Sequence, residues 1–475
     1  MRGVLTFLSD SEVEQIHEAS LRILKETGVK VLSEKVRKLL ADNGAEVDGE
    51  IVKIPKPMVE EAARRAPREI ILGARDPKCD LKIPGGEFPF IATSGFSPFI
   101  TTNLETKERR QSTSSDLRDF AIVGDYLETL DYFWPIVIPN DLPPPLQELH
   151  AAAIALRNNR KHIQCSCVTE KTAQWQIRLA TTIVGGEAEL KKRPIFSTVN
   201  CVVAPLTFEK DSSEAMVVLA RAGIPISPMT MVLGGTTAPV TLAGTLAVGN
   251  AEELAALVMV EYANPGAPLI YTSEAAPADM KTGEINYKAP EYPLLSAGAA
   301  QMARFYELPS LVADISLEEV VSDVPSFERN VLRVAMAFMS RTDLSAWLGS
   351  CDRALSASLD QLILDAEVCK HAHAYLRQFE INNDTLAMDV IYEVGPGGHF
   401  LDKTHTLKHF KREIWSRQFA DTFVLDSAAK GSYIEKAKAK VKEILASHTP
   451  LPLKENVDKE MQQILTDAEK DMLEK

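Results

Sequence analysis

The stretch RPIFSTVNCVVAPLTFEKDSSEAMVVLARAGIPISPMT, residues 193–230, decides the fold class. A β-rich run, Ile195 to Val199, follows Pro194, and a helical pattern occupies residues 210–222. A second β-rich run begins around Pro225. Proline is tolerated at the first position of a strand and marks the end of a preceding helix. The stretch therefore predicts a strand, a helix and a second strand, the unit from which parallel sheets are built.

The same alternation extends in both directions, and prolines 194, 225, 268 and 309 each lie close to the start of a β-rich run. Such prolines recur about every 30 to 45 residues, the length of one strand–helix unit with its loop. Eight β-rich runs lie at 90–93, 133–137, 162–165, 195–199, 224–226, 269–272, 311–313 and 344–348, with helical patterns between them at 147–157, 171–184, 210–222, 241–263, 294–306, 326–340 and 360–379.

Eight units favour an α/β fold of the closed (β/α)8 TIM type over an open doubly wound sheet. The open sheet normally carries a glycine-rich turn after its first strand, and Gly234-Gly235-Thr236-Thr237 lacks that fingerprint. We expect an N-terminal helical cap over residues 1–85, a catalytic barrel over 86–425 and a C-terminal helical tail over 426–475. The Lys/Glu-rich tail is expected to be exposed or to dock a subunit.

Composition narrows the classes of function. The chain has 475 residues and a formal charge of −14, so phosphate backbones are repelled and nucleic-acid binding is not expected. Six cysteines in so long a chain do not form a disulfide framework, which suggests reduced thiols and a cytoplasmic location. Neither a signal peptide nor an uninterrupted apolar stretch of about 20 residues is apparent, so no membrane association is expected.

Functional residues of such a barrel cluster where its strands end and in the loops that follow. Phe96, Tyr271 and Trp347 fall at these ends, and Phe400 lies near them in the same interpretation. Rings around a small cavity bind an alkylammonium ion, each contributing about 0.5–2 kcal/mol when well placed. Any one of these rings, taken alone, is more often ordinary core.

Carboxylates and histidines offer other chemistry. Asp141 and Glu274 both follow strands, where they are candidates for proton transfer or for pairing with a charge. The alternative for Asp141 is a cap before Pro143-Pro144-Pro145. His405 and His409 have the i, i+4 spacing of metal ligands, but we interpret them as part of a loop and the first turn of an exposed helix. The sequence therefore predicts no metal site.

A glycine-rich turn, Gly395-Pro396-Gly397-Gly398-His399-Phe400, follows a β-like run at 389–392. Its glycines allow close approach of another backbone or of a large flat ligand, although an ordinary tight turn has the same composition. We expect it to close the last repeats of the barrel and to form a lip of the active-site cavity.

At this turn the sequence resembles the trimethylamine methyltransferase superfamily of corrinoid-dependent methyltransferases. The resemblance rests on residues 395–401, on His405-Thr406-Leu407-Lys408-His409-Phe410, and on the opening pattern from Leu8 to Val29. Residues 93–96 and 348–350 contribute to it as well.

The resemblance implies a barrel that removes a methyl group from a methylated amine. The methyl group passes to the Co(I) centre of a separate corrinoid protein, so no cofactor is bound directly. Founding members carry pyrrolysine in the segment that corresponds to Ala354–Asp360, where this chain has ordinary residues. Members without pyrrolysine act on quaternary amines, which makes a betaine, with glycine betaine first, the expected substrate.

A quaternary ammonium is charged at every pH, so transfer needs alignment and a dry pocket rather than a general acid. The expected catalytic residues are Asp141 and Glu274, the expected substrate contacts are Phe96, Tyr271, Trp347, Gly349, His399 and Phe400, and the expected contacts with the corrinoid partner are Gly395, Gly397 and Gly398. The donor to a substrate carboxylate stays open among His399, Arg353 and a backbone amide.

Two other functions remain in view. One is a barrel lyase or hydrolase that uses Asp141 and Glu274, and the other is a betaine-binding protein without transfer activity. The acidic chain with additional terminal helices is compatible with a homo-oligomer, such as a dimer.

Overall fold

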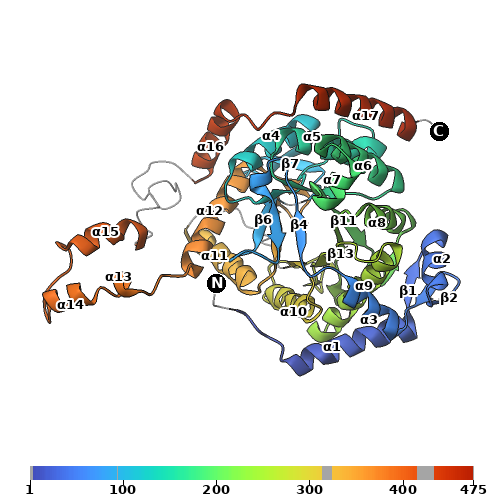
Figure 1. The fold of residues 1–475 in the computed structure, drawn as a ribbon, viewed down its shortest axis with the longest axis horizontal. Coiled ribbons are helices and arrows are strands. Elements are labelled where there is room, and N and C mark those ends of the chain that lie inside the picture. Colours follow the sequence, from blue (N-terminus) through green and yellow to red (C-terminus); the bar gives the residue numbers. More distant parts are fainter. Residues whose placement is uncertain (1–3, 94, 313–323, 414–432, 474–475) are drawn as a thin grey trace.

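The computed structural model describes residues 4–93, 95–312, 324–413 and 433–473. At its centre lies a parallel eight-stranded sheet, ordered β6-β18-β17-β15-β13-β11-β10-β9, with helices around it (Figure 1). Its strands are β6 (Phe90–Thr93), β9 (Tyr132–Phe133), β10 (His162–Ser166), β11 (Phe196–Val202), β13 (Ile226–Thr230), β15 (Tyr271–Ser273), β17 (Ser310–Val312) and β18 (Leu344–Leu348). Each of the eight expected runs contains or overlaps one of these strands. Of the expected run at 311–313, residue 313 lies outside the described part of the chain, as do the strand-end residues 314–316.

Hydrogen bonds between the first two strands of the barrel complete its closure. The Asp131 amide donates to the Ile91 carbonyl at 2.8 Å, and the Asp131 carboxylate accepts from the Ile91 amide at 2.8 Å. The Thr93 hydroxyl donates to the Trp134 carbonyl at 2.5 Å. Because β6 also pairs with β18, the sheet closes on itself and the expected (β/α)8 barrel is confirmed.

Helices cover the outside of the barrel. Thr113 and Thr169 cap the first turns of α4 and α6 by accepting a backbone N–H two or three residues into the helix. The covering helices are α4 (Ser114–Tyr126), α5 (Gln147–Asn158), α6 (Glu170–Val184), α7 (Glu187–Lys192), α8 (Lys210–Ala222), α9 (Leu242–Ala263), α10 (Glu291–Phe305), α11 (Val324–Met339) and α12 (Leu359–Leu376), with a short 3-10 turn at Pro144–Leu146.

One of these helices, α9, is long and apolar enough to cross a membrane by length and composition. However, 83% of its most apolar window is buried inside the protein. It packs against α1, α3, α8 and α10 and against strands of the barrel, so it is a core helix.

The N-terminal segment is not purely helical, as the sequence had suggested. Its strand β1 pairs with β3 on one side and with β12 (Thr207–Phe208), from a barrel loop, on the other. The elements are α1 (Asp10–Arg22), a π turn (Ile23–Thr27), β1 (Val29–Val31), α2 (Glu34–Asp42), β2 (Glu46–Asp48), β3 (Ile51–Lys53), α3 (Lys56–Arg65), β4 (Ile70–Leu72), a 3-10 turn (Pro77–Cys79) and β5 (Leu81–Ile83). Three-residue strands leave little periodicity to detect in a sequence.

Residues 377–413 form a segment, here called the arm, that projects away from the barrel (Figure 1). It carries α13 (Asn383–Leu386), α14 (Met388–Val394) and α15 (Thr404–Glu413). The β-like interpretation of residues 389–392 is therefore wrong, because this run lies within α14. A run of four residues is too short to separate a strand from one turn of helix.

The two last helices, α16 (Tyr433–Ser447) and α17 (Glu455–Leu473), lie against the body of the protein. Helix α16 buries Ile434 and Ile444 against α12 and α4, and α17 buries Met461 and Leu465 next to α6. The sequence predicted these helices correctly, but the tail is part of the packed body rather than an exposed appendage.

Candidate active site at the mouth of the barrel

The barrel is open only at the carboxyl ends of its strands, because the β4–β5 hairpin fills the other end. Leu72 and Ile83 of this hairpin belong to the same buried cluster as the inward-facing side chains of the barrel. The Gly73 amide donates to the carbonyl of Pro194, just before the amino end of β11, at 2.8 Å. At the open end the loops form short strands of their own: β7 (Phe99–Asn103), β8 (Glu108–Gln111), β14 (Leu233–Gly234), β16 (Ala276–Pro277), β19 (Ser350–Cys351) and β20 (Ser356–Ala357).

Trp347 is a large aromatic side chain of the barrel interior. Strict alternation along β18 would turn it outward, since Leu344 and Ala346 already face inward. A register irregularity in the pairing of β18 with β6 and a φ of 88° at Trp347 bring the indole into the interior cluster. Its ring centroid lies 5.9 Å from that of Tyr287, which comes from the loop after β16.

Trp134 supplies a second indole to the same cluster. It follows β9 directly, two residues after the inward-facing Tyr132. Gly95 packs flat on this ring, because a Cβ atom built at residue 95 would lie only 2.3 Å from Cε2 of Trp134. Glycine at 95 therefore fixes where the Trp134 ring lies at the mouth.

Several buried polar atoms of the barrel make no hydrogen bond within the described part of the chain. Gln164 lies between Ile163 and Cys165, which both face the outer helices, so its amide points into the barrel. Ser227 has the same orientation, two residues before the inward-facing Met229. The atoms concerned are Nε2 and Oε1 of Gln164, Oγ of Ser227 and Nε1 of Trp134 and Trp347. Buried polar groups are normally satisfied, so this concentration is typical of a ligand pocket.

Glu274 adds a carboxyl group to this set. Its amide donates to the Thr230 carbonyl at 2.8 Å, which continues the β15–β13 ladder by one residue. Alternation from the inward-facing Ile270 therefore directs Glu274 into the barrel at its open end. The residue is 2% exposed, and neither carboxyl oxygen has a hydrogen-bond partner among the residues that the structure describes. A buried carboxyl group without a partner is costly, so its presence calls for a ligand.

Backbone strain is concentrated in the loop after β18. Asp352, Arg353 and Ala354 have φ angles of 51°, 57° and 64°. Left-handed conformations cost about 1–2 kcal/mol for each such residue. Ala354 packs against the interior cluster, so this strained turn borders the mouth and belongs to the segment that the family resemblance equates with pyrrolysine. Strain of this kind is common at ligand-binding sites.

Asp365 of α12 holds the backbone that follows Trp347. One oxygen accepts the Gly349 amide at 2.8 Å, and the other accepts Nε2 of Gln361 at 2.6 Å. Complete burial raises the pKa of Asp365 to about 8. Gly349 has a φ of 83°, which favours glycine. Because its amide is engaged by Asp365, Gly349 shapes the mouth rather than donating to a substrate.

A cavity of about 440 Å³ lies at the rim, above β6 and β18. It is lined by the β7–β8 hairpin, by residues 279–288 and by the strained turn. Arg353 lines it and hydrogen-bonds to the Glu284 carboxylate. Its other basic lining residues are Lys107, Arg109 and Lys288, and its acidic ones are Asp279, Glu284 and Asp352.

Two of the expected aromatic contacts face other surroundings. Tyr271 points outward from β15, and its hydroxyl donates to Oδ1 of Asn250 in α9 at 3.0 Å. Burial raises the pKa of this tyrosine well above its usual value. Phe96 is half-buried, with a φ of 55°, and packs against the cluster shared with the outer helices. Trp347 is thus the expected ring that the interior cluster contains.

The turn at residues 395–400 is not part of the barrel wall. It connects α14 to α15 within the arm, and its His399 and Phe400 are exposed. Nδ1 of His399 lies 3.6 Å from a carboxylate oxygen of Asp402, its neighbour in the arm. The structure therefore separates these residues from the interior cluster. A contact of Gly395, Gly397 and Gly398 with a corrinoid partner stays a prediction.

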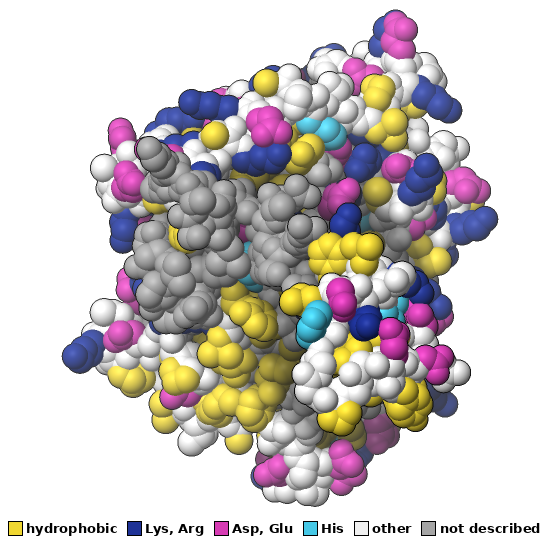
Figure 2. Space-filling model, turned by 90° about the vertical axis from the view of Figure 1, so that its left-hand side faces the viewer, with side chains coloured by type: hydrophobic (Ala, Val, Ile, Leu, Met, Phe, Trp, Pro, Cys, Tyr) yellow, Lys and Arg dark blue, Asp and Glu magenta, His cyan; other side chains and the backbone are white. Residues whose placement is uncertain are grey.

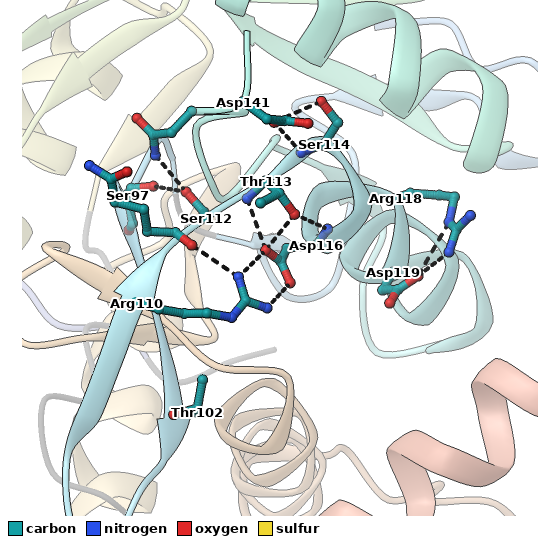
Figure 3. Close-up of polar contacts among 12 residues, drawn as sticks. Ser97, Thr102, Arg110, Ser112, Thr113, Ser114, Asp116, Arg118, Asp119 and Asp141 are labelled. Carbon is teal, nitrogen blue, oxygen red and sulfur yellow. Dashed lines mark hydrogen bonds and ion pairs between the residues drawn. The ribbon is translucent and has the colours of Figure 1, made fainter.

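Asp141 serves as a cap rather than as the partner of Glu274. Its Oδ1 accepts the Ser114 amide at 2.7 Å and the Ser114 hydroxyl at 3.1 Å, at the start of α4 (Figure 3). In the same view Arg110 bonds to Asp116, whose carboxylate also accepts from Thr113. Asp141 thus belongs to a network that fixes α4, the alternative that the sequence left open.

The profile of the trimethylamine methyltransferase family matches residues 2–472. The chain belongs to this family. A trimethylamine methyltransferase of Desulfitobacterium hafniense is 29% identical over 473 residues, covering 98% of this chain and 94% of that protein. A glycine betaine methyltransferase of the same species is 29% identical over 469 residues, covering 98% and 97%. The family membership makes the chain a methyltransferase.

The fold agrees with that of a solved relative. The crystal structure of the Methanosarcina barkeri monomethylamine methyltransferase superposes with a TM-score of 0.53 at 13% identity. The match covers 99% of this chain and 88% of that one. At this identity the likeness supports the shared barrel alone.

Sequence reasoning missed Gln164, Ser227 and Trp134. Gln164 had a detectable signal, since it is a polar side chain between Ile163 and Cys165 in an otherwise apolar run. Trp134 follows Tyr132 at the spacing of two that marks one face of a strand. Ser227 carried no signal, because serine is common on every kind of surface.

Proposed function

We propose that this methyltransferase demethylates a quaternary amine of the betaine type, with glycine betaine as the first choice, and passes the methyl group to Co(I) of a separate corrinoid protein. The single observation that carries this proposal is the buried Glu274 carboxyl group, unpartnered among the described residues, in a barrel interior that holds two indoles. A carboxylate and aromatic faces are the groups that attract an alkylammonium ion in a dry site. The similarity to a glycine betaine methyltransferase supports the choice of substrate.

The reaction breaks the bond between a methyl carbon and the quaternary nitrogen. The nitrogen keeps the electron pair and leaves as a neutral tertiary amine, while the reduced cobalt supplies the pair for the new bond to carbon. No proton is transferred, so the site needs no general acid or base, in agreement with the capping role of Asp141. The protein aligns the methyl group and excludes water.

In this proposal Glu274 is the counter-ion of the substrate nitrogen, and Trp347 and Trp134 present their rings to its methyl groups. A quaternary nitrogen has no N–H to donate, so it interacts with the carboxylate through charge alone. The corrinoid partner approaches from the carboxyl ends of the strands, because the β4–β5 hairpin fills the opposite end.

Arg353 is the donor that we assign to the substrate carboxylate. It lines the rim cavity, whereas His399 lies in the arm. A guanidinium group suits bidentate recognition of a carboxylate. Arg353 already bonds to Glu284, so the substrate carboxylate takes over part of that interaction.

The test measures methyl-cobalt formation from full-length protein and Co(I) corrinoid, with glycine betaine, tetramethylammonium and trimethylamine. Glu274→Gln keeps the shape of the side chain and removes its charge, and Asp141→Asn is the matched control at a second strand end. An ion pair at about 4 Å and an effective dielectric constant of about 20 is worth at most about 4 kcal/mol. We expect kcat/KM for glycine betaine to fall at least about 100-fold in Glu274→Gln and less than about threefold in Asp141→Asn.

Equal losses in both variants would contradict the assignment of Glu274 and favour the paired-carboxylate lyase or hydrolase. Tight calorimetric binding of glycine betaine without transfer to any corrinoid would favour the betaine-binding protein. A preference for trimethylamine would keep the reaction and overturn the substrate class.

Arg353→Ala separates the carboxylate from the ammonium group of the substrate. We expect KM for glycine betaine to rise at least about tenfold, since a lost charged hydrogen bond costs about 1.5–3 kcal/mol. KM for tetramethylammonium, which has no carboxylate, should stay within about twofold. An equal rise for both would mean that Arg353 only maintains the mouth through Glu284.

We also propose a cytoplasmic location and no nucleic-acid or membrane partner. All six cysteines are unpaired, as expected for a reducing compartment. The negative net charge opposes binding to phosphate backbones.

A further inference from the structure

The arm has no hydrophobic core of its own. None of the residues of α13, α14 and α15 is buried. Figure 2 views the molecule from the side on which the arm projects, and hydrophobic side chains lie at the surface there. Exposed apolar residues of the arm include Phe379, Ile381, Tyr392, Leu401 and Leu407. A small segment without a core is usually held together by another device, such as a disulfide or a metal ion.

Three potential metal ligands meet inside the arm. His405 and His409 are one turn apart on α15, so they share a face of the helix. Their ring centroids are 4.3 Å apart. Asp384 reaches the same place from α13, and one ligand atom from each of the three residues lies within 4.8 Å of the others. The sequence spacing alone did not reveal this site, because Asp384 is 21 residues away from His405.

The contacts within the cluster are those of ligands facing one point. Nε2 of His409 lies 3.2 Å from Oδ2 of Asp384, yet it makes no hydrogen bond in the described part of the chain. Nε2 of His405 lies 2.9 Å from the backbone carbonyl of Asp384, which leaves its Nδ1 as the second ring nitrogen. The His409 side chain is only 13% exposed, so the carboxylate and the imidazoles approach each other at the edge of water.

One neighbour competes for the carboxylate. Nζ of Lys408 lies 2.9 and 2.8 Å from the two oxygens of Asp384. The hydrogen bond from Lys408 lowers the pKa of Asp384, so this carboxylate is ionised at neutral pH. An ion at the cluster would have to share Asp384 with Lys408 or displace it.

We propose that Asp384, His405 and His409 bind one divalent transition-metal ion of the zinc class, which joins α13 to α15 and orders the arm. Two imidazoles and one carboxylate suit such an ion, and water completes its coordination. The ion closes the loop between residues 384 and 405, which contains α14 and the glycine-rich turn. The site is separate from the barrel mouth, so its occupancy and the proposed demethylation are tested independently.

The experiment titrates chelator-treated, full-length protein with Zn²⁺ by calorimetry and with Co²⁺ by visible absorption. We expect one ion per chain with a Kd below about 1 μM, and cobalt bands typical of nitrogen and oxygen ligands. His405→Ala and His409→Ala should each weaken binding by more than the about 10–100-fold that loss of an outer-shell contact costs. His399→Ala, an exposed histidine of the same arm outside the cluster, should have no effect.

Lys408→Ala gives a result that a purely structural cluster would not give. Removing the competing ammonium group should tighten zinc binding, by about threefold or more, since an exposed charge pair is worth up to about 1 kcal/mol. Limited proteolysis should cut the arm faster without zinc than with it. Circular dichroism of each variant checks that its body is folded.

Three results would overturn the proposal. They are fewer than about 0.2 ions per chain at saturating zinc, binding that persists in the His405→Ala/His409→Ala double variant, and binding that is lost with Cys201→Ser, the exposed cysteine. In each case the cluster would be an ordinary ion pair between Asp384 and Lys408.

Discussion

Replacing Tyr271 by phenylalanine separates a structural role for this ring from a place in the substrate cage. Its hydroxyl donates to Oδ1 of Asn250 at 3.0 Å. The amide nitrogen of Asn250 donates in turn to the hydroxyls of Ser20 and Tyr306, both at 2.9 Å. One buried network thus links a barrel strand to α9, to the N-terminal helix α1 and to the end of α10.

The expected cost follows from what the change leaves behind. Tyr271→Phe removes one donor and leaves Oδ1 of Asn250 buried without a partner, which costs about 1–3 kcal/mol. Unfolding entropy is about 2 cal/mol/K per residue, so for a chain of this length the Tm should fall by about 1–3 °C. KM for a quaternary amine should stay within about twofold, because the ring points away from the barrel interior.

The assay compares thermal unfolding and steady-state kinetics of Tyr271→Phe with those of Trp347→Ala. Loss of the Trp347 ring from a cation site should raise KM by a factor of about 2 to 30, the equivalent of about 0.5–2 kcal/mol. The reasoning is refuted if Tyr271→Phe leaves the Tm unchanged and raises KM by fivefold or more. That outcome would place the tyrosine in contact with the substrate.

Two further predictions concern the mouth. Gly95→Ala should displace the Trp134 ring at a cost of about 1–3 kcal/mol, shift the tryptophan emission and weaken amine binding; unchanged emission and affinity would show that the ring tolerates the methyl group. Burial raises the pKa of Asp365 from 3.8 to about 8, so between these pH values the folded chain holds a proton that the unfolded chain has lost, and stability falls as pH rises. Asp365→Asn does not titrate, so its deficit in urea midpoint against the wild type should shrink from pH 5 to pH 8; a constant deficit would mean that Asp365 ionises normally.

The barrel was predictable because its signals are repeated. Proline-led β-rich runs such as that after Pro194 recur at the spacing of one strand–helix unit, and each helix between them is long enough to show its period. Alternation from Ile270 also predicts the outward direction of Tyr271, although position at a strand end alone does not. Glu274 was placed correctly at the mouth, for the same reason of strand position.

Other features depend on contacts that a single sequence does not encode locally. Trp347 faces inward only because β18 is irregular against β6, a feature of the pairing of two distant segments. Asp141 looked like a catalytic partner of Glu274 because both follow strands, but its hydrogen bond to Ser114 is a tertiary contact. The arm was assigned to the barrel wall because a run of apolar residues before Gly395 does not reveal whether it packs against anything.

The hairpin that fills the amino end of the barrel also sets the order of events in catalysis. A vessel with one opening must be loaded before the corrinoid protein covers it, and the demethylated amine leaves only after that protein withdraws. The enzyme should therefore follow a compulsory-order kinetic scheme, with the amine first on and last off. Excess corrinoid protein bound to the empty barrel would then slow turnover by obstructing entry.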